Sequence, residues 1–195
     1  MVLGITGKYC SGKNTVSGIF VSHGWYEIDV DRLGYRALEE KASEVISLFG
    51  KDITGSTGEI DRKKLGDIVF SSQKALAALE SVIHPVMVSL CKREIEECGN
   101  TSVIINAAIL HKMGLNRLCD AVLWVESPFL RRMGRALVRD SRSVCHILKR
   151  MAAQRKLDAK YYREVVDSYT IWNGSSVHTL ETDVMKVITA MGERK

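Results

Sequence analysis

The stretch Gly4–Val16, "GITGKYCSGKNTV", constrains the fold of this chain more than any other. It overlaps a short apolar run, Val2–Thr6, that is typical of a buried strand, and it leads into a segment with helical spacing. Gly7, Gly12 and Lys13 match the G-x-x-x-x-G-K frame, in which backbone N–H groups and a helix N terminus surround phosphates and the lysine reaches the β- and γ-phosphates. A strand, a glycine turn and a helix therefore predict an α/β fold with a phosphate site.

The rest of the chain alternates short apolar runs with segments of helical spacing. Such alternation predicts a parallel sheet covered by helices on both faces. The helical stretch from Gly50 to Gly99 is the best candidate for an inserted unit, and we expect "HP" at His84–Pro85 to interrupt its helix because proline removes a backbone donor. The four further strands are expected at Tyr26–Asp29, Ser102–Ala107, Ala121–Val125 and Tyr169–Trp172.

The amino-acid composition limits which classes of ligand and which cellular compartments are expected. The 195 residues are 46% hydrophobic and 26% charged, which suits one globular unit with a sizeable core. A formal charge of +5 fits an anionic ligand, which nucleic acid, a membrane surface or a phosphorylated small molecule could each provide. The five cysteines lack zinc spacing, and neither a secretion signal nor a membrane span is seen, so we expect free thiols and a cytoplasmic location.

The phosphate loop departs from its usual sequence in two ways. Asn14 stands where such loops place a serine or threonine for magnesium; its amide oxygen is a suitable hard ligand, and the hydroxyl of Thr15 is the rival candidate. Lys8, Tyr9 and Cys10 occupy positions where related loops often carry glycine, so left-handed backbone there would be strained. We expect the nucleotide to be bound by Gly7, Cys10, Ser11, Gly12, Lys13, Asn14 and Thr15.

Two carboxylates follow the second expected strand. Asp29 and Asp31 are two residues apart, so in extended geometry they share a face at the strand end that opens on the ligand crevice in this fold class. Phosphoryl transfer needs a group that accepts or orients the acceptor hydroxyl, which either carboxylate could supply. The alternative is that Asp31 caps the next helix.

A basic stretch runs from Arg131 to Lys156. Arginines at positions 131, 135, 139 and 142 recur at spacings of four, four and three, so most would line one helix face. In a nucleotide enzyme, the same arrangement serves as a mobile lid that closes arginines over the triphosphate. A solvated surface or a nucleic-acid footprint is the alternative, although the aromatic residues typical of single-strand binders are missing.

Taken together, these motifs resemble the dephospho-CoA kinase family over nearly the full length of the chain. The most specific features are "IDVD", "GEIDRKKL" and "LESVIHP" in that order, and the phosphate loop, "RALVRD", "RMAAQ" and "NGS" also match. Two positions depart from the family: Asn106 and Ala108 stand in "NAAIL", where the family often has an acid and a proline. We expect these changes to affect acceptor binding or a carboxylate's help with metal.

The resemblance implies transfer of the ATP γ-phosphate to the ribose 3′-hydroxyl of dephospho-CoA, with Mg²⁺. It implies a three-layer P-loop kinase core with a five-stranded parallel sheet (about 1–49, 100–130 and 165–195), a helical CoA-binding insert (about 50–99) and a lid (about 131–164). Asp31 would be the general base with Asp29 in support, and Lys13 would stabilise the migrating phosphoryl group. Arg135 and Arg139 would bind the nucleotide from the lid or its hinge, with Arg139 counted among the catalytic residues. Arg62 and His84 would bind the CoA moiety in the insert.

Three rival interpretations stay open. The first is another small-molecule P-loop kinase, acting on a nucleoside or nucleotide. The second is a weakly catalytic relative, given Asn14 and Asn106. The third is a nucleotide-binding regulator that uses the basic stretch without chemistry. We expect no nucleic-acid or membrane partner, and the sequence leaves the oligomeric state open.

Overall fold

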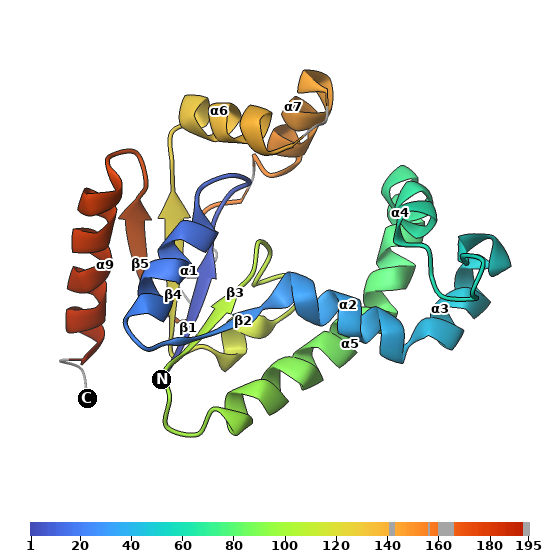
Figure 1. Cartoon of the computed structure of the whole chain (residues 1–195), viewed down its shortest axis with the longest axis horizontal. Coiled ribbons are helices and arrows are strands. Elements are labelled where there is room, and N and C mark those ends of the chain that lie inside the picture. The colour runs from blue at the N-terminus through green and yellow to red at the C-terminus, as the bar shows by residue number, and fades with distance from the viewer. Residues whose placement is uncertain (141–142, 156, 160–165, 193–195) are drawn as a thin grey trace. The chain divides into compact units, whose positions relative to one another are not determined.

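The computed structural model describes residues 1–140, 143–155, 157–159 and 166–192. The chain forms two compact units. The first comprises Met1–Ile28 and Glu97–Lys195, and the second comprises Asp29–Glu96. Figure 1 labels the elements of both units.

The first unit is built around a sheet whose strand order is β2-β3-β1-β4-β5. β1 pairs in parallel with β3 and β4, and β4 pairs in parallel with β5. This confirms the predicted five-stranded parallel sheet. The strands are β1 (Val2–Thr6), β2 (Tyr26–Asp29), β3 (Val103–Asn106), β4 (Ala121–Glu126) and β5 (Asp167–Trp172).

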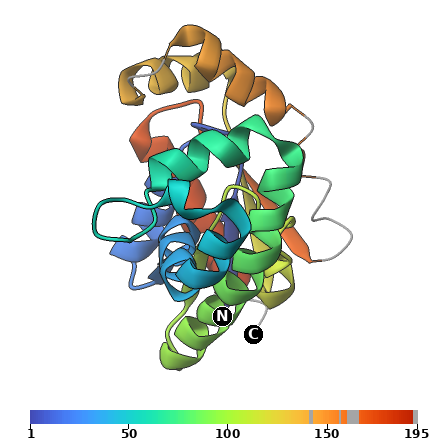
Figure 2. The ribbon, with the colours of Figure 1, turned by 90° about the vertical axis from the view of Figure 1, so that its right-hand side faces the viewer.

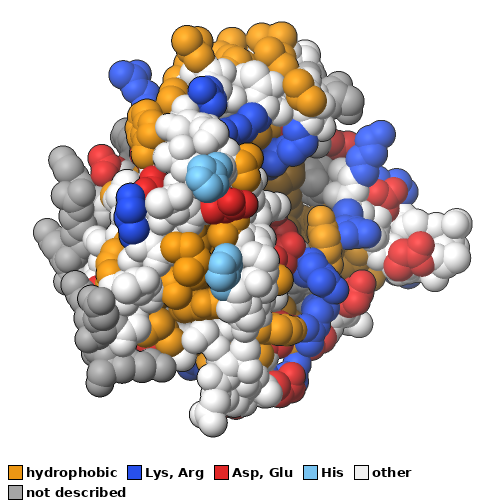
Figure 3. Space-filling view, turned by 60° about the vertical axis from the view of Figure 1, so that its left-hand side comes forward, with side chains coloured by type: hydrophobic (Ala, Val, Ile, Leu, Met, Phe, Trp, Pro, Cys, Tyr) orange, Lys and Arg blue, Asp and Glu red, His pale blue; other side chains and the backbone are white. Residues whose placement is uncertain are grey.

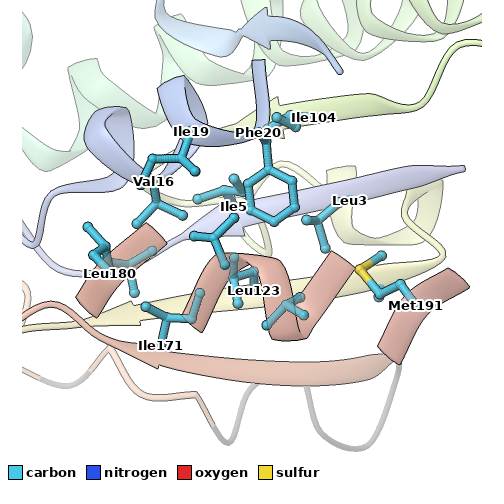
Figure 4. Close-up of a cluster of buried hydrophobic side chains, with 14 residues drawn as sticks. Leu3, Ile5, Val16, Ile19, Phe20, Ile104, Leu123, Ile171, Leu180 and Met191 are labelled. Carbon is cyan, nitrogen blue, oxygen red and sulfur yellow. The ribbon is translucent and has the colours of Figure 1, made fainter. Parts of the chain in front are cut away.

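Helices α1 (Lys13–Ser22) and α9 (Val177–Gly192) pack on one face of this sheet. Figure 4 shows their apolar side chains meeting those of β1 and β4 in one cluster. Leu3 and Ile5 of β1 are fully buried there, and burial of each such side chain stabilises the fold by roughly 1.5–3 kcal/mol. Gly4 points to the opposite face, where an added Cβ would meet Leu110. The central strands are therefore apolar on both faces, as a parallel sheet requires.

Two other described helices of the first unit follow the carboxyl end of β4. They are α6 (Phe129–Arg139) and α7 (Val144–Ala153), and a short turn of 3₁₀ helix, η2 (Leu115–Leu118), precedes β4. Ala136, Ile147 and Met151 form a small apolar cluster that also contains two residues of the phosphate loop. The basic stretch thus has its own packing contact with the loop.

The second unit is helical. Its elements are α2 (Val30–Glu40), α3 (Ala42–Phe49), η1 (Lys51–Ile53), α4 (Arg62–Ser71) and α5 (Gln73–Glu97), and Figure 2 brings α3, α4 and α5 forward. Val45, Ile53 and Leu65 are buried in its core. The unit begins at Asp29, whereas the insert was expected from about residue 50. Within this unit α3 contacts both α2 and η1, and η1 contacts α4, so these elements form one body.

The predicted interruption at His84–Pro85 is wrong. α5 continues through Pro85, and the helical stretch breaks instead at Ser72. Proline inside a helix costs about 3 kcal/mol. Burial of apolar side chains along α5 offsets that cost, and these residues are Leu79, Met87, Leu90 and Cys91.

Among the described residues, α5 alone has the length and apolar composition of a membrane-crossing helix. A single helix of this kind is weak evidence for a membrane span, because helices of other proteins meet the same criterion.

Candidate active site

The phosphate loop connects β1 to α1 in the first unit, as predicted. Gly12, at φ 96°, precedes α1, whose first residue is Lys13, and Lys13 Nζ donates to the Gly7 carbonyl at 3.2 Å. A Cβ on Gly7 would lie 2.4 Å from the carbonyl oxygen of Val125, and one on Gly12 would lie 2.0 Å from Asn173 Nδ2. Only glycine fits at either position. The loop therefore turns back over the end of β4 and presents the N terminus of a helix, the arrangement that binds phosphate groups.

Cys10 shows the backbone strain that was expected in this loop. Its φ is 57°, and no other non-glycine residue in the described ranges has a positive φ. Left-handed backbone at a non-glycine residue costs roughly 1–2 kcal/mol. The side chain is buried with Ala136, Ile147 and Met151, so packing against α6 and α7 helps to hold the conformation.

The hydroxyl of Ser11 fits an anionic ligand. Ser11 is fully buried, and its Oγ has no hydrogen-bond partner within the described residues. A buried hydroxyl without a partner costs about 1–3 kcal/mol. An oxygen-rich group in the loop would supply the missing partner.

Arg135 supports the loop from α6. One guanidinium nitrogen, Nη1, donates to the carbonyls of Cys10 (3.3 Å) and Ser11 (3.1 Å), and Nη2 donates to Asn173 Oδ1 at 3.1 Å. Asn173 in turn donates to the Ser11 carbonyl at 2.9 Å. Burial lowers the pKa of Arg135, and Arg131 lowers it further. The planar, multidentate guanidinium suits this position because it contacts several carbonyls at once.

Arg139, the second predicted lid arginine, contacts Tyr9. Its guanidinium carbon lies 5.1 Å from the Tyr9 ring centroid, and that of Arg150 lies 4.7 Å away. Arg139 Nε also donates to Asp140 at 3.1 Å. Burial lowers the pKa of Arg139, but the bonds to Asp140 and Tyr9 raise it overall.

The surface of the basic stretch is both cationic and apolar. Figure 3 shows hydrophobic side chains with Lys and Arg side chains below them at its upper end, where Figure 1 places α6 and α7. Leu130 and Val138 are among the most exposed apolar residues of α6. Arg142, the fourth arginine of the predicted stripe, lies outside the described residues.

The expected metal ligand, Asn14, belongs to a polar cluster beside the loop. Asn106 Nδ2 donates to Asn14 Oδ1 at 3.2 Å and to Glu27 Oε1 at 2.9 Å, and Ser17 Oγ donates to the same carboxylate oxygen at 2.6 Å. Thr15, the rival candidate, is exposed, and its hydroxyl makes no hydrogen bond among the described residues.

The side-chain oxygens of Asn14 and Thr15 fit the magnesium ion that the sequence resemblance implies, because Mg²⁺ binds oxygen and needs few protein ligands when phosphates supply the rest. No group of three or more His, Cys, Asp or Glu side chains that could hold a metal occurs within the described chain. These residues therefore suit a site in which the metal ion is bound jointly by the protein and by the phosphates of the nucleotide.

The remaining predicted residues lie in the second unit. Asp29 caps α2 by accepting from the Asp31 backbone N–H at 2.9 Å, so the capping role falls to Asp29 and leaves the Asp31 carboxylate exposed. The guanidinium of Arg62 lies 4.3 Å from the Tyr35 ring centroid. Both line a hollow of about 340 Å³ together with apolar residues of α2 and α3. His84 is half-buried on α5.

Sequence reasoning assigned no role to Glu27, Asn173 or Tyr9. Glu27 could have been noticed, because it precedes Asp29 by two residues and shares its strand face. Asn173 belongs to the "NGS" motif, but only the fold reveals its contact with Ser11.

A parallel sheet with a glycine loop, a lysine at the start of α1 and a basic helical pair beside it defines a P-loop kinase fold. Comparison with known proteins identifies the branch. A model of the dephospho-CoA kinase family matches residues 1–178. The chain therefore belongs to the dephospho-CoA kinase family, which confirms the resemblance seen in the sequence.

Individual relatives agree. A dephospho-CoA kinase of Borreliella burgdorferi is 44% identical over 124 residues, which are 63% of this chain and 60% of that protein. One from Thermus thermophilus is 31% identical over 191 residues, which are 98% of this chain and 92% of that protein. The solved structure of dephospho-CoA kinase from Campylobacter jejuni superposes with a TM-score of 0.71 at 25% identity, over 98% of this chain and 97% of that one.

Proposed function

We propose that this protein is an ATP-dependent phosphotransferase that phosphorylates the ribose 3′-hydroxyl of dephospho-CoA to give coenzyme A. The proposal rests on the geometry of the phosphate loop, in a chain that belongs to the dephospho-CoA kinase family. Gly7 and Gly12 have no room for a side chain, and Lys13 begins α1 beside them. Relatives that match along nearly their whole length are named dephospho-CoA kinase.

The nucleotide side of the reaction falls to the first unit. The loop amides and the Ser11 hydroxyl bind phosphate oxygens, and Lys13 stabilises the charge that moves with the γ-phosphoryl group. Arg135 stabilises the loop conformation by donating to the carbonyls of Cys10 and Ser11. Arg139 lies next to Tyr9 of the loop and contacts the triphosphate. Mg²⁺, held through Asn14 with Thr15 as the rival ligand, supplies charge neutralisation when bound.

The acceptor side falls to the second unit. Asp31 is exposed and accepts the proton of the 3′-hydroxyl, while Asp29 holds the turn on which Asp31 stands. Arg62, stacked on Tyr35 at the hollow of this unit, and His84 bind the CoA moiety. The substrates are thus ATP and dephospho-CoA, with no nucleic-acid or membrane partner, and the reaction takes place in the cytoplasm.

One assay tests the acceptor and the base together. The protein is incubated with ATP, magnesium and either dephospho-CoA or a panel of nucleosides, and ADP release is followed. Rapid turnover with dephospho-CoA alone is expected, and rapid turnover with a nucleoside alone would overturn the acceptor assignment.

The same assay is repeated with Asp31→Asn and with Asp67→Asn, an exposed carboxylate on α4 that serves as the matched control. Removal of a general base lowers kcat by about 10²–10⁴-fold. Asp31→Asn should show this loss with ATP affinity unchanged, and Asp67→Asn should behave as the wild type. Equal activity of the two variants would remove Asp31 from the mechanism.

A further inference from the structure

Glu27 on β2 lies in the polar cluster that contains the expected metal ligand. Its Oε1 accepts from the hydroxyl of Ser17 on α1 and from the amide of Asn106 at the end of β3. The same amide reaches Asn14 Oδ1. Two elements of the first unit, α1 and β3, thus converge on the carboxylate of β2, and the Asn106 amide links it to Asn14 at the start of α1.

Within the described chain, the Glu27 carboxylate accepts hydrogen bonds from neutral donors only. No lysine or arginine within residues 1–140, 143–155, 157–159 and 166–192 forms an ion pair with it, and its second oxygen, Oε2, makes no hydrogen bond there. Ser17 is fully buried and Asn106 is 8% exposed. A half-buried carboxylate in such surroundings retains an unbalanced charge, which a bound cation would compensate.

We propose that Glu27 supplies the carboxylate of the magnesium site and acts on the same metal as Asn14. This inference rests on the proposed function, which requires a metal with ATP. Hard cations select carboxylate and amide oxygens, and Asn106 orients one of each. The acid that the family often has at position 106 is absent here, and Glu27 places a carboxylate 2.9 Å from the amide that replaces it.

The rival explanation is that Glu27 only ties β2 to α1 and β3. The two roles differ in their dependence on charge. Glu27→Gln keeps the size of the side chain and an oxygen that can accept from Ser17, but it removes the negative charge. If Glu27 only connects β2 to α1 and β3, this change should leave Mg²⁺ binding intact. If Glu27 binds the metal, the change should weaken Mg²⁺ binding.

The test measures nucleotide binding without dephospho-CoA. A fluorescent ATP analogue is titrated into the wild type and Glu27→Gln at a series of Mg²⁺ concentrations and in excess chelator. We expect the Mg²⁺ concentration for half-maximal binding to rise at least tenfold in Glu27→Gln, with metal-free affinity unchanged. Glu126→Gln is the matched control, because Glu126 is a strand glutamate of the same sheet whose carboxylate accepts from Trp124 Nε1 instead; it should leave the Mg²⁺ requirement unaltered.

A second variant tests the proposal by restoring a carboxylate to the cluster. The double variant Glu27→Gln/Asn106→Asp moves the carboxylate to the adjacent strand and should restore the wild-type Mg²⁺ requirement. An unchanged requirement in Glu27→Gln, an equal loss of binding with and without metal, or a raised requirement in the double variant would each overturn the proposal. Because the acceptor is not used, a failure of phosphoryl transfer to dephospho-CoA would be recognised separately.

Discussion

Tyr9 of the phosphate loop donates its phenolic hydroxyl to the carboxylate of Asp140, which immediately follows α6. The guanidinium groups of Arg139 and Arg150 lie against the Tyr9 ring. Burial and the bond to Asp140 raise the pKa of Tyr9, and the same bond holds the pKa of Asp140 below its ordinary value. The loop and the basic stretch therefore form one hydrogen-bonded assembly, in which the arginines also contact an aromatic ring.

Tyr9→Phe tests the strength of this link. The change removes one hydrogen bond to a charged group, so we expect the free energy of unfolding to fall by about 1.5–3 kcal/mol. Retention of the ring preserves the contacts with Arg139 and Arg150. Urea unfolding provides the measurement, and Tyr35→Phe, at an exposed tyrosine, is the control that should change by less than about 0.5 kcal/mol. Equal effects of the two variants would mean that the bond to Asp140 contributes nothing.

The lowered pKa of Asp140 predicts a pH dependence. Because the folded protein holds the ionised carboxylate more favourably, its contribution to stability is present above the unfolded pKa of about 3.9 and is lost as the pH falls through the lower folded value. The difference in unfolding free energy between the wild type and Asp140→Asn should therefore be constant from about pH 7 to pH 5 and shrink below pH 4. A difference that grows on acidification would contradict the assignment.

Local sequence patterns predicted the strands and the phosphate loop, because these depend on residues that are close together in the sequence. The apolar runs became strands because a parallel sheet buries both faces, and the glycine frame became a loop because its backbone leaves no space for side chains. The helix break was misplaced because burial along α5 outweighs the cost of Pro85.

Contacts between distant parts of the chain could not be predicted in this way. Tyr9 and Asp140 are 131 positions apart, and Ser11 and Asn173 are 162 apart. No periodicity links such residues. The contact of Arg135 with the loop was missed for the same reason, since an arginine on an amphipathic helix equally predicts a solvated surface.

Arg135→Lys should weaken ATP binding by about tenfold, which corresponds to about 1.4 kcal/mol. A lysine ammonium cannot contact the carbonyls of Cys10 and Ser11 and the side chain of Asn173 in one plane, so the loop loses part of its support. Equilibrium binding of ATP measures the effect. Arg131→Lys is the matched control, because Arg131 is exposed on the same helix and makes a single long bond to the Ser175 carbonyl. The same loss in both variants would show that the effect does not come from the contacts of Arg135 with the loop.

Gly12→Ala should abolish ATP binding and destabilise the fold, because a methyl group would lie 2.0 Å from Asn173 Nδ2 and the backbone is left-handed at φ 96°. Displacement of Asn173 would also break its bonds to Ser11 and Arg135. Gly18→Ala, inside the helix α1 that follows Gly12 and with open space around it, is the control and should raise the free energy of unfolding by roughly 0.5–1 kcal/mol through helix propensity. Thermal unfolding and ATP titration of both variants supply the comparison, and a Gly12→Ala protein that binds ATP like the wild type would refute the tight packing of the loop against Asn173.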